Sequence, residues 1–163
     1  MKDWVIPQQH RFEEGLYELE CIEVRGPHRM GGRYKLELVF AVVCGPYSDE
    51  LAYEVSVNSS ETAPPGPSGQ TVSCYYNLQR TGEQFSYGRR GKLRRHAELA
   101  LGGSLDEVGD LTPEEIFLGK RFLARVGTVK REYRGQALRG RDQYSVVREL
   151  LRLVDEVPRN DEC

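Results

Sequence analysis

The feature that most constrains the fold is a regular alternation of apolar and polar side chains. From Tyr34 to Cys44 (YKLELVFAVVC) every second position is apolar, and the first intervening residues are Lys35 and Glu37. A period of two places successive side chains on opposite faces of a β-strand, so that one face is buried. Leu16–Val24 (LYELECIEV) alternates with acidic residues and predicts an earlier strand. Gly26-Pro27 is expected to begin the loop between the two strands.

Two further strands are expected before the middle of the chain. Tyr53–Val57 (YEVSV) predicts a short third strand, and Val72–Leu78 (VSCYYNL) predicts a fourth. In the fourth strand, Tyr76 falls on the apolar face and is expected in the core, whereas Tyr75 falls on the outer face. The intervening Asn58–Thr71 contains three prolines and two glycines, which predicts a long flexible surface loop.

The second half of the chain combines helices with a hairpin. Residues 89–101 carry apolar side chains at helical spacing and precede two glycines, which predicts a helix. Thr112, followed by proline and two glutamates, predicts the start of a second, short helix. Residues 120–133 and 142–148 predict the two strands of a hairpin, and residues 149–157 predict a short terminal helix.

The order of these elements predicts the fold class. Three or four strands, then a helix and a two-stranded hairpin, match a mainly β, five-stranded, OB-fold-like Greek-key barrel with a helix between strands three and four. The long flexible loop then lies near strand three. A different small β-barrel with an added helix stays open. The 163 residues fit a single domain at 15–157, with an N-terminal extension at 1–14 and a frayed tail at 158–163.

The chain contains no familiar catalytic or cofactor motif. A phosphate-binding glycine loop, a nucleophile elbow and a zinc-protease motif are all absent from the sequence. We therefore predict a protein that is not an enzyme and has no cofactor, although a metal-dependent nuclease built from scattered acids stays open. Cys21, Cys44 and Cys74 are far apart, so we predict no metal site and expect buried, reduced thiols. His96 lies among basic residues and is expected to be solvated.

Two further patterns bear on location. No run of the sequence approaches the roughly 18 apolar residues of a membrane-spanning helix. The first residues lack the basic stretch and apolar core of a secretory signal. These patterns predict a cytoplasmic protein without membrane contact.

The distribution of charge points toward nucleic acid, although the formal net charge is only −2. Between Lys120 and Arg141 the chain carries eight basic residues and one acid, and a second basic cluster covers residues 89–95. Local fields steer charged ligands, and single strands bind where cations alternate with aromatic rings. A solvated basic face without a partner is the competing interpretation. The predicted nucleic-acid-binding residues are Lys35, Tyr75, Arg89, Arg90, Arg94, Arg95, Arg121, Arg125, Lys130, Arg131, Tyr133, Arg134, Arg139 and Arg141.

Four sequence segments carry a resemblance to a known family. They are G-L-Y-E-L-E-C-I-E-V, K-L-E-L-V-F-A-V-V-C-G-P-Y, L-G-K-R-F-L-A-R-V-G-T-V and Y-S-V-V, and together they span roughly residues 15–150. The set resembles small OB-fold single-stranded DNA-binding proteins of phages and plasmids. The resemblance implies non-catalytic binding of single strands in DNA replication or recombination of a mobile element.

The sequence therefore predicts largely sequence-independent binding of single-stranded nucleic acid, with DNA as the expected ligand and RNA open. The alternative is a protein-interaction module on the same fold, such as an accessory subunit of a mobile-element complex. Assembly as a homo-oligomer, or with a protein partner, also stays open.

Overall fold

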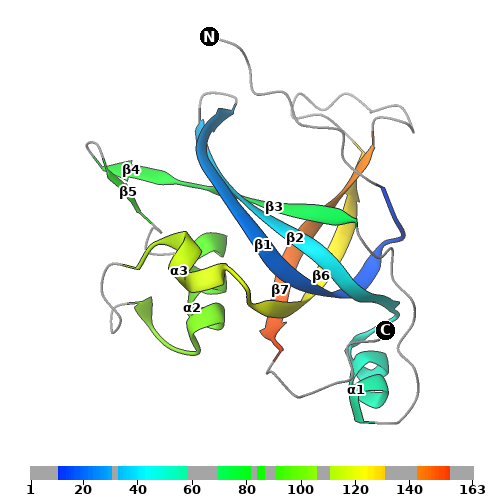
Figure 1. Ribbon diagram of the computed structural model, residues 1–163. Coiled ribbons are helices and arrows are strands. Elements are labelled where there is room, and N and C mark those ends of the chain that lie inside the picture. Colours follow the sequence, from blue (N-terminus) through cyan, green and yellow to red (C-terminus); the bar gives the residue numbers. More distant parts are fainter. Residues whose placement is uncertain are drawn as a thin grey trace.

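The computed structural model describes residues 11–30, 33–58, 70–81, 84–86, 91–105, 111–130 and 143–154. Over these residues the protein is mainly β, with three helices (Figure 1). The elements are β1 (Gly15–Met30), β2 (Arg33–Tyr47), α1 (Glu50–Asn58), β3 (Thr71–Asn77), β4 (Gln79–Thr81), β5 (Gln84–Ser86), α2 (Lys92–Leu101), α3 (Pro113–Phe117), β6 (Arg121–Val129) and β7 (Tyr144–Leu153).

Five of the strands form one sheet whose hydrogen bonds close into a ring. The strand order is β1-β2-β3-β7-β6, and β6 pairs back onto β1. The pairing of β3 with β7, at Ser73 and Val146, is parallel, and the other pairings in the ring are antiparallel. The short strands β4 and β5 form a separate two-stranded sheet. The mainly β prediction is therefore confirmed, as is a five-stranded sheet with a helix between its third and fourth strands.

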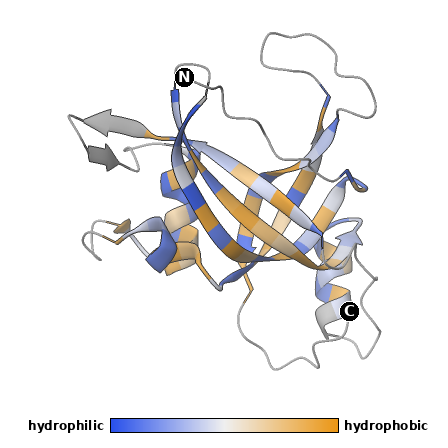
Figure 2. Ribbon diagram, turned by 45° about the horizontal axis from the view of Figure 1, so that its top comes forward, coloured by the Kyte–Doolittle hydropathy of each residue, from blue (hydrophilic) through white to orange (hydrophobic). Residues whose placement is uncertain are grey.

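The main core lies inside the ring and follows the two-residue alternation of the strands. Apolar and polar residues alternate along the strands in Figure 2. On β2, Leu38 and Phe40 are fully buried, and the Phe40 ring meets that of Phe122 from β6 edge-on at 6.1 Å between centroids. Helices α2 and α3 contribute Leu93 and Ile116 to the same core, and they lie side by side next to the sheet (Figure 1).

Helix α1 replaces the strand that was predicted over Tyr53–Val57, so that prediction is wrong. Asp49 begins the helix, because its Oδ1 accepts the backbone N–H of Ala52 at 2.7 Å. Tyr53 is then buried against Tyr47, with ring centroids 5.1 Å apart, in a second, smaller apolar cluster. A run of five residues contains too few alternations to distinguish a strand from a helix that buries a single aromatic ring.

Three strands run further than the sequence indicated, and β2 continues past its predicted end at Cys44 to Tyr47. Residues 149–153, predicted as part of a terminal helix, continue β7, because Glu149 pairs with Arg125 and Leu153 pairs with Phe122 on β6. Strand β1 continues through Gly26-Pro27, which has a cis peptide bond and does not end the strand. Gly26 has a φ of 123°, and a Cβ there would lie 2.8 Å from the carbonyl oxygen of Lys35.

Other expectations are confirmed where the structure describes them. Helix α2 ends at Gly102 in the left-handed conformation, and Thr112 forms the predicted capping box with Glu115. Cys21 and Cys74 are buried free thiols, but Cys44 is disulfide-bonded, so the prediction of a reduced thiol is wrong there. No helix among the described residues is long and apolar enough to cross a membrane.

Several predicted features cannot be placed. The N-terminal residues 1–10, most of the loop (59–69), the tip of the hairpin (131–142) and the tail (155–163) lie outside the described residues.

Candidate nucleic-acid interface

The outer face of β2 and β3 carries the aromatic residue singled out in the sequence. Tyr76 is 2% exposed and points into the core, while its neighbour Tyr75 is half-buried on the opposite face. Tyr75 lies directly opposite Glu37 of β2, and the next outward pair is Lys35 with Asn77. The predicted strand register is therefore confirmed, and two predicted binding residues lie on one face of the sheet.

Two other cations lie near Lys35 at this end of the sheet, and one of them, Lys92, contacts the core side of β3. Burial lowers the pKa of Lys35, and the nearby charges of Arg33 and Lys92 lower it further. Lys92 belongs to the first turn of α2, and its Nζ lies 5.3 Å from the centroid of the Tyr76 ring. Three like charges close enough to perturb one another repel, and a bound anion relieves that repulsion. This end of the sheet is therefore electrostatically suited to a phosphate group.

Further along the same face a buried carboxylate interrupts the positive charge. Glu37 is 2% exposed, and its Oε2 accepts a hydrogen bond from Ser73 Oγ at 2.5 Å. Its Oε1 lies 3.9 Å from the guanidinium of Arg25, which is also paired with Glu23 at 2.9 Å. The face is thus basic at the Lys35 end only.

Four other predicted cations are paired with carboxylates. Arg94 lies 3.3 Å from Glu98, Arg95 makes a bidentate contact with Glu149, Arg121 lies 3.0 Å from Glu20 and Lys130 lies 4.0 Å from Glu14. The acidic partners of Arg95, Arg121 and Lys130 lie far from them in the sequence. A count of charges within one sequence segment therefore did not include these acids. These ion pairs reduce the positive field that the sequence predicted.

The remaining predicted residues divide into two groups. Arg125 is exposed on β6 and lines a groove that also contains Glu14, Asp49 and Glu50. The others lie outside the part of the chain that the structure describes, so their placement stays a prediction; they are Arg89, Arg90, Arg131, Tyr133, Arg134, Arg139 and Arg141.

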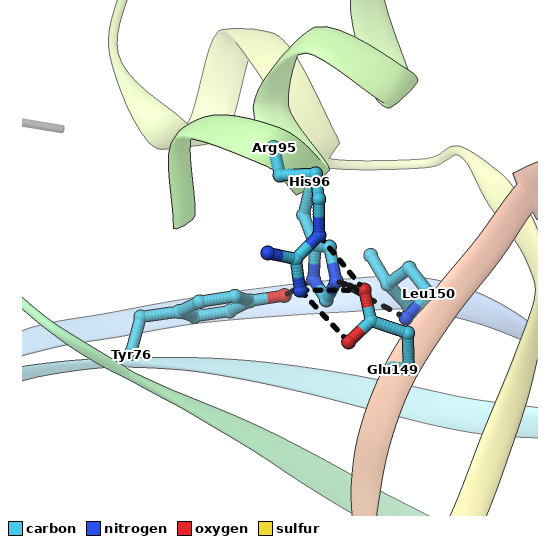
Figure 3. A network of polar contacts seen from close by, with 5 residues as sticks. All are labelled: Tyr76, Arg95, His96, Glu149 and Leu150. Carbon is cyan, nitrogen blue, oxygen red and sulfur yellow. Dashed lines mark hydrogen bonds and ion pairs between the residues drawn. The ribbon is translucent and has the colours of Figure 1, made fainter. Parts of the chain in front are cut away.

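A polar network that the sequence did not predict connects α2 to the core side of β3 and to β7 (Figure 3). His96 is fully buried, so the expectation of a solvated side chain is wrong. Its Nε2 lies 2.8 Å from Oε1 of Glu149 on β7, and its Nδ1 lies 2.7 Å from the hydroxyl of Tyr76 on β3. A carboxylate only accepts hydrogen bonds, so we assign the proton to Nε2, and the Tyr76 hydroxyl donates to Nδ1.

Burial of this network favours the neutral imidazole of His96. Burial lowers the pKa of His96, Lys92 and Arg95 lower it further, and Glu149 acts in the opposite direction. Burial by itself would raise the pKa of Glu149, but hydrogen bonds from His96 and Arg95 outweigh burial and lower it. Since His96 and Tyr76 are both buried, a substrate has no access to either side chain. The network is structural, and it holds Lys92 at the basic end of the sheet.

One sequence signal could have revealed the position of His96. Leu93, His96, Ala97 and Ala100 are the buried residues of α2, and their spacing of three, four and seven defines one helix face. The other three residues are among the apolar side chains whose spacing predicted a helix over residues 89–101. A histidine in the middle of such a stripe is buried with it and requires hydrogen-bond partners there.

Two other kinds of site, a metal centre and a nucleophilic thiol, have little support in the described residues. They contain no group of three or more His, Cys, Asp or Glu side chains that could hold a metal ion. Burial raises the pKa of the Cys74 thiol, which disfavours the nucleophilic thiolate. The chain matches no protein-family model, no curated protein and no solved structure. A functional assignment therefore depends on this chain's own residues.

Proposed function

We propose that this protein is a non-catalytic binder of single-stranded nucleic acid, with DNA as the expected ligand, built on an OB-fold-like barrel. The observation that carries the proposal is the placement of Tyr75 on the same sheet face as Lys35, whose charge is supplemented from nearby by Arg33 and, from the core side of β3, by Lys92. A partly exposed aromatic ring offers a surface on which a base stacks, and nearby cations attract the phosphate that follows.

The sheet topology supports the proposed OB-fold-like architecture. The ring β1-β2-β3-β7-β6, with α2 and α3 inserted between β3 and β6, corresponds to a five-stranded barrel whose helix lies between strands three and four. OB-folds bind oligonucleotides on the face of strands two and three, which correspond here to β2 and β3. The basic end of the sheet lies on that face.

The proposal is tested by the fluorescence anisotropy of labelled single- and double-stranded 20-nucleotide DNA at two salt concentrations. We expect tighter binding of the single strand and a loss of affinity as salt rises. Tyr75→Ala weakens single-strand binding by about 1–3 kcal/mol because it removes one stacking surface. Lys35→Ala reduces the log–log salt slope by about 0.7 because it removes one phosphate contact.

Arg121→Ala is the matched control, since it also removes one positive charge but from a residue paired with Glu20 on another part of the sheet. It should leave single-strand affinity close to that of the wild type. Equal losses in the Lys35 and Arg121 variants would point to net charge alone. Unchanged affinity in the Tyr75 and Lys35 variants would reject this face as the binding site. An RNA strand of the same sequence shows which nucleic acid is preferred.

A protein-interaction module is the second candidate function, and two observations favour it. Ion pairs neutralise part of the expected basic surface, and α1 presents Leu51 and Val55 at 68% and 52% exposure. Exposed apolar side chains one turn apart are suited to contact with another protein. Absence of oligonucleotide binding at low salt would make this the leading function.

A further inference from the structure

A shallow groove lies beside the start of α1, on strands other than those that carry Tyr75. Its hollow of about 710 Å³ is bounded by the segment that enters β1, the turn that precedes α1 and the middle of β6. A second hollow of about 580 Å³ continues along Arg11–Glu14 to Thr128. Glu14 lines both hollows, so the two lie next to each other along the segment that enters β1.

The groove has apolar residues in its lining. Leu16 and Val126 are 4% and 1% exposed and form part of its wall, whereas Leu51 of α1 is 68% exposed beside them. An apolar side chain of a partner that docks here removes Leu51 from water, which favours association. Val55, one helical turn later, is also exposed but does not line the groove, so it offers an internal comparison.

The charged residues of the larger hollow determine what kind of partner fits. Glu14, Asp49 and Glu50 contribute three carboxylates, and Arg125 contributes one guanidinium. Oδ1 of Asp49 caps α1, but Glu50 and Glu14 are exposed, and Glu14 lies 4.0 Å from the ammonium of Lys130, a long contact for an ion pair. A phosphate backbone would be repelled here, although Arg125 by itself suggests a phosphate contact. A cationic segment is attracted.

We propose that this groove docks a short, extended, cationic segment of a partner protein. An aliphatic side chain of the segment packs against Leu51, and lysine or arginine side chains on either side pair with Glu14 and Glu50. The proposal is independent of nucleic-acid binding, because none of its residues lies on the Tyr75 face.

A fluorescein-labelled seven-residue peptide that alternates lysine and leucine is the probe, and its glutamate–leucine counterpart is the charge control. The anisotropy titration uses the full-length protein at low and moderate salt. We expect the lysine peptide to bind, its affinity to fall with salt, and the glutamate peptide not to bind. Glu14→Lys combined with Glu50→Lys should weaken binding by about tenfold or more, since each exposed ion pair contributes roughly two- to fivefold.

Matched variants distinguish binding in the groove from the effects of net charge and of nonspecific hydrophobic adsorption. Leu51→Ser should weaken the lysine peptide several-fold, whereas Val55→Ser should not. Glu23→Lys reverses an exposed acid on β1 outside the groove and should have little effect. Circular dichroism checks that the variants at these five surface positions, three glutamates and two aliphatic residues, are folded. Tyr75→Ala should leave peptide binding unchanged, which distinguishes this site from the proposed nucleic-acid face.

Three outcomes would overturn the proposal. The first is no difference between the lysine and glutamate peptides. The second is equal weakening by Leu51→Ser and Val55→Ser. The third is a concentration-dependent dimer in sedimentation equilibrium that Leu51→Ser converts to a monomer while the peptide fails to bind, because the groove would then hold a second copy of this chain.

Discussion

The hydroxyl of Tyr76 provides the sharpest test of how α2 is held against the sheet. Tyr76→Phe keeps the buried ring, which lies 5.4 Å from the His96 ring and 6.5 Å from that of Phe117, and removes only the donor to Nδ1. The imidazole nitrogen is then left in the core without a hydrogen-bond partner. A buried polar atom that loses its partner costs about 1–3 kcal/mol, more than the net value of an ordinary hydrogen bond.

The measurement is urea unfolding of the wild type, Tyr76→Phe, His96→Leu and the double variant. We expect each single substitution to lower the free energy of unfolding, Tyr76→Phe by about 1–3 kcal/mol. His96→Leu leaves both the hydroxyl of Tyr76 and the carboxylate of Glu149 without the imidazole, so its loss should be at least as large. The double variant should lose less than the sum, because neither the hydroxyl nor Nδ1 is then left unpaired.

Strict additivity of the two substitutions would contradict this account of the network. A loss below about 0.5 kcal/mol for Tyr76→Phe would do the same, since that is the range of ordinary surface substitutions. Tyr144→Phe is a suitable control, because this half-buried tyrosine lies on β7 and is not part of the network.

Three further predictions follow from the same contacts. Folding lowers the pKa of His96 below the value of about 6.5 that it has in the unfolded chain. Its contribution to stability is therefore present above about pH 6.5 and is lost as the pH falls through the folded-state pKa. Urea midpoints measured from about pH 7.5 to 5 should drop more steeply for the wild type than for His96→Leu. Tyr76→Ala should cost about 3–5 kcal/mol in urea unfolding, whereas Tyr75→Ala should stay close to wild type, and the reverse order would refute the assigned register. Gly26→Ala should lower the free energy of unfolding by about 1–3 kcal/mol, because a φ of 123° is strained for alanine and the new Cβ meets the carbonyl oxygen of Lys35 on β2. Gly103→Ala is the control: a Cβ there has no atom within 4 Å, so this variant should be as stable as the wild type in the same assay.

The parts of the fold that the sequence predicts correctly are those governed by local rules. The alternation over Tyr34–Cys44 and Val72–Leu78 specifies which side chains enter the core, and it separates Tyr75 from Tyr76 without knowledge of the neighbouring strands. The capping box at Thr112 is equally local, because all of its hydrogen bonds lie within four residues. Helix α1 escaped prediction because its stability depends on a tertiary contact between Tyr53 and Tyr47.

The candidate site depends on long-range pairing, and for that reason only part of it could be predicted. A count of basic residues along the chain treats Arg121 as an available cation, but the β1–β6 register places Glu20, one hundred and one positions away, directly beside it. Glu149 likewise neutralises the charge of Arg95 through a hydrogen-bonded ion pair. Charges separated in sequence by most of a domain cancel wherever strand pairing brings them together.

What remains after this cancellation is a smaller basic surface in a definite place. Burial lowers the pKa of Lys35, and the nearby charges of Arg33 and Lys92 lower it further. Charges of like sign therefore lie near one another at one end of the sheet, close to a partly buried tyrosine. Stability alone does not favour such an arrangement, whereas binding of an anionic strand would. This contrast between the group of cations near Lys35 and the carboxylate-paired cations elsewhere is the physical reason to test this end of β2 and β3 first.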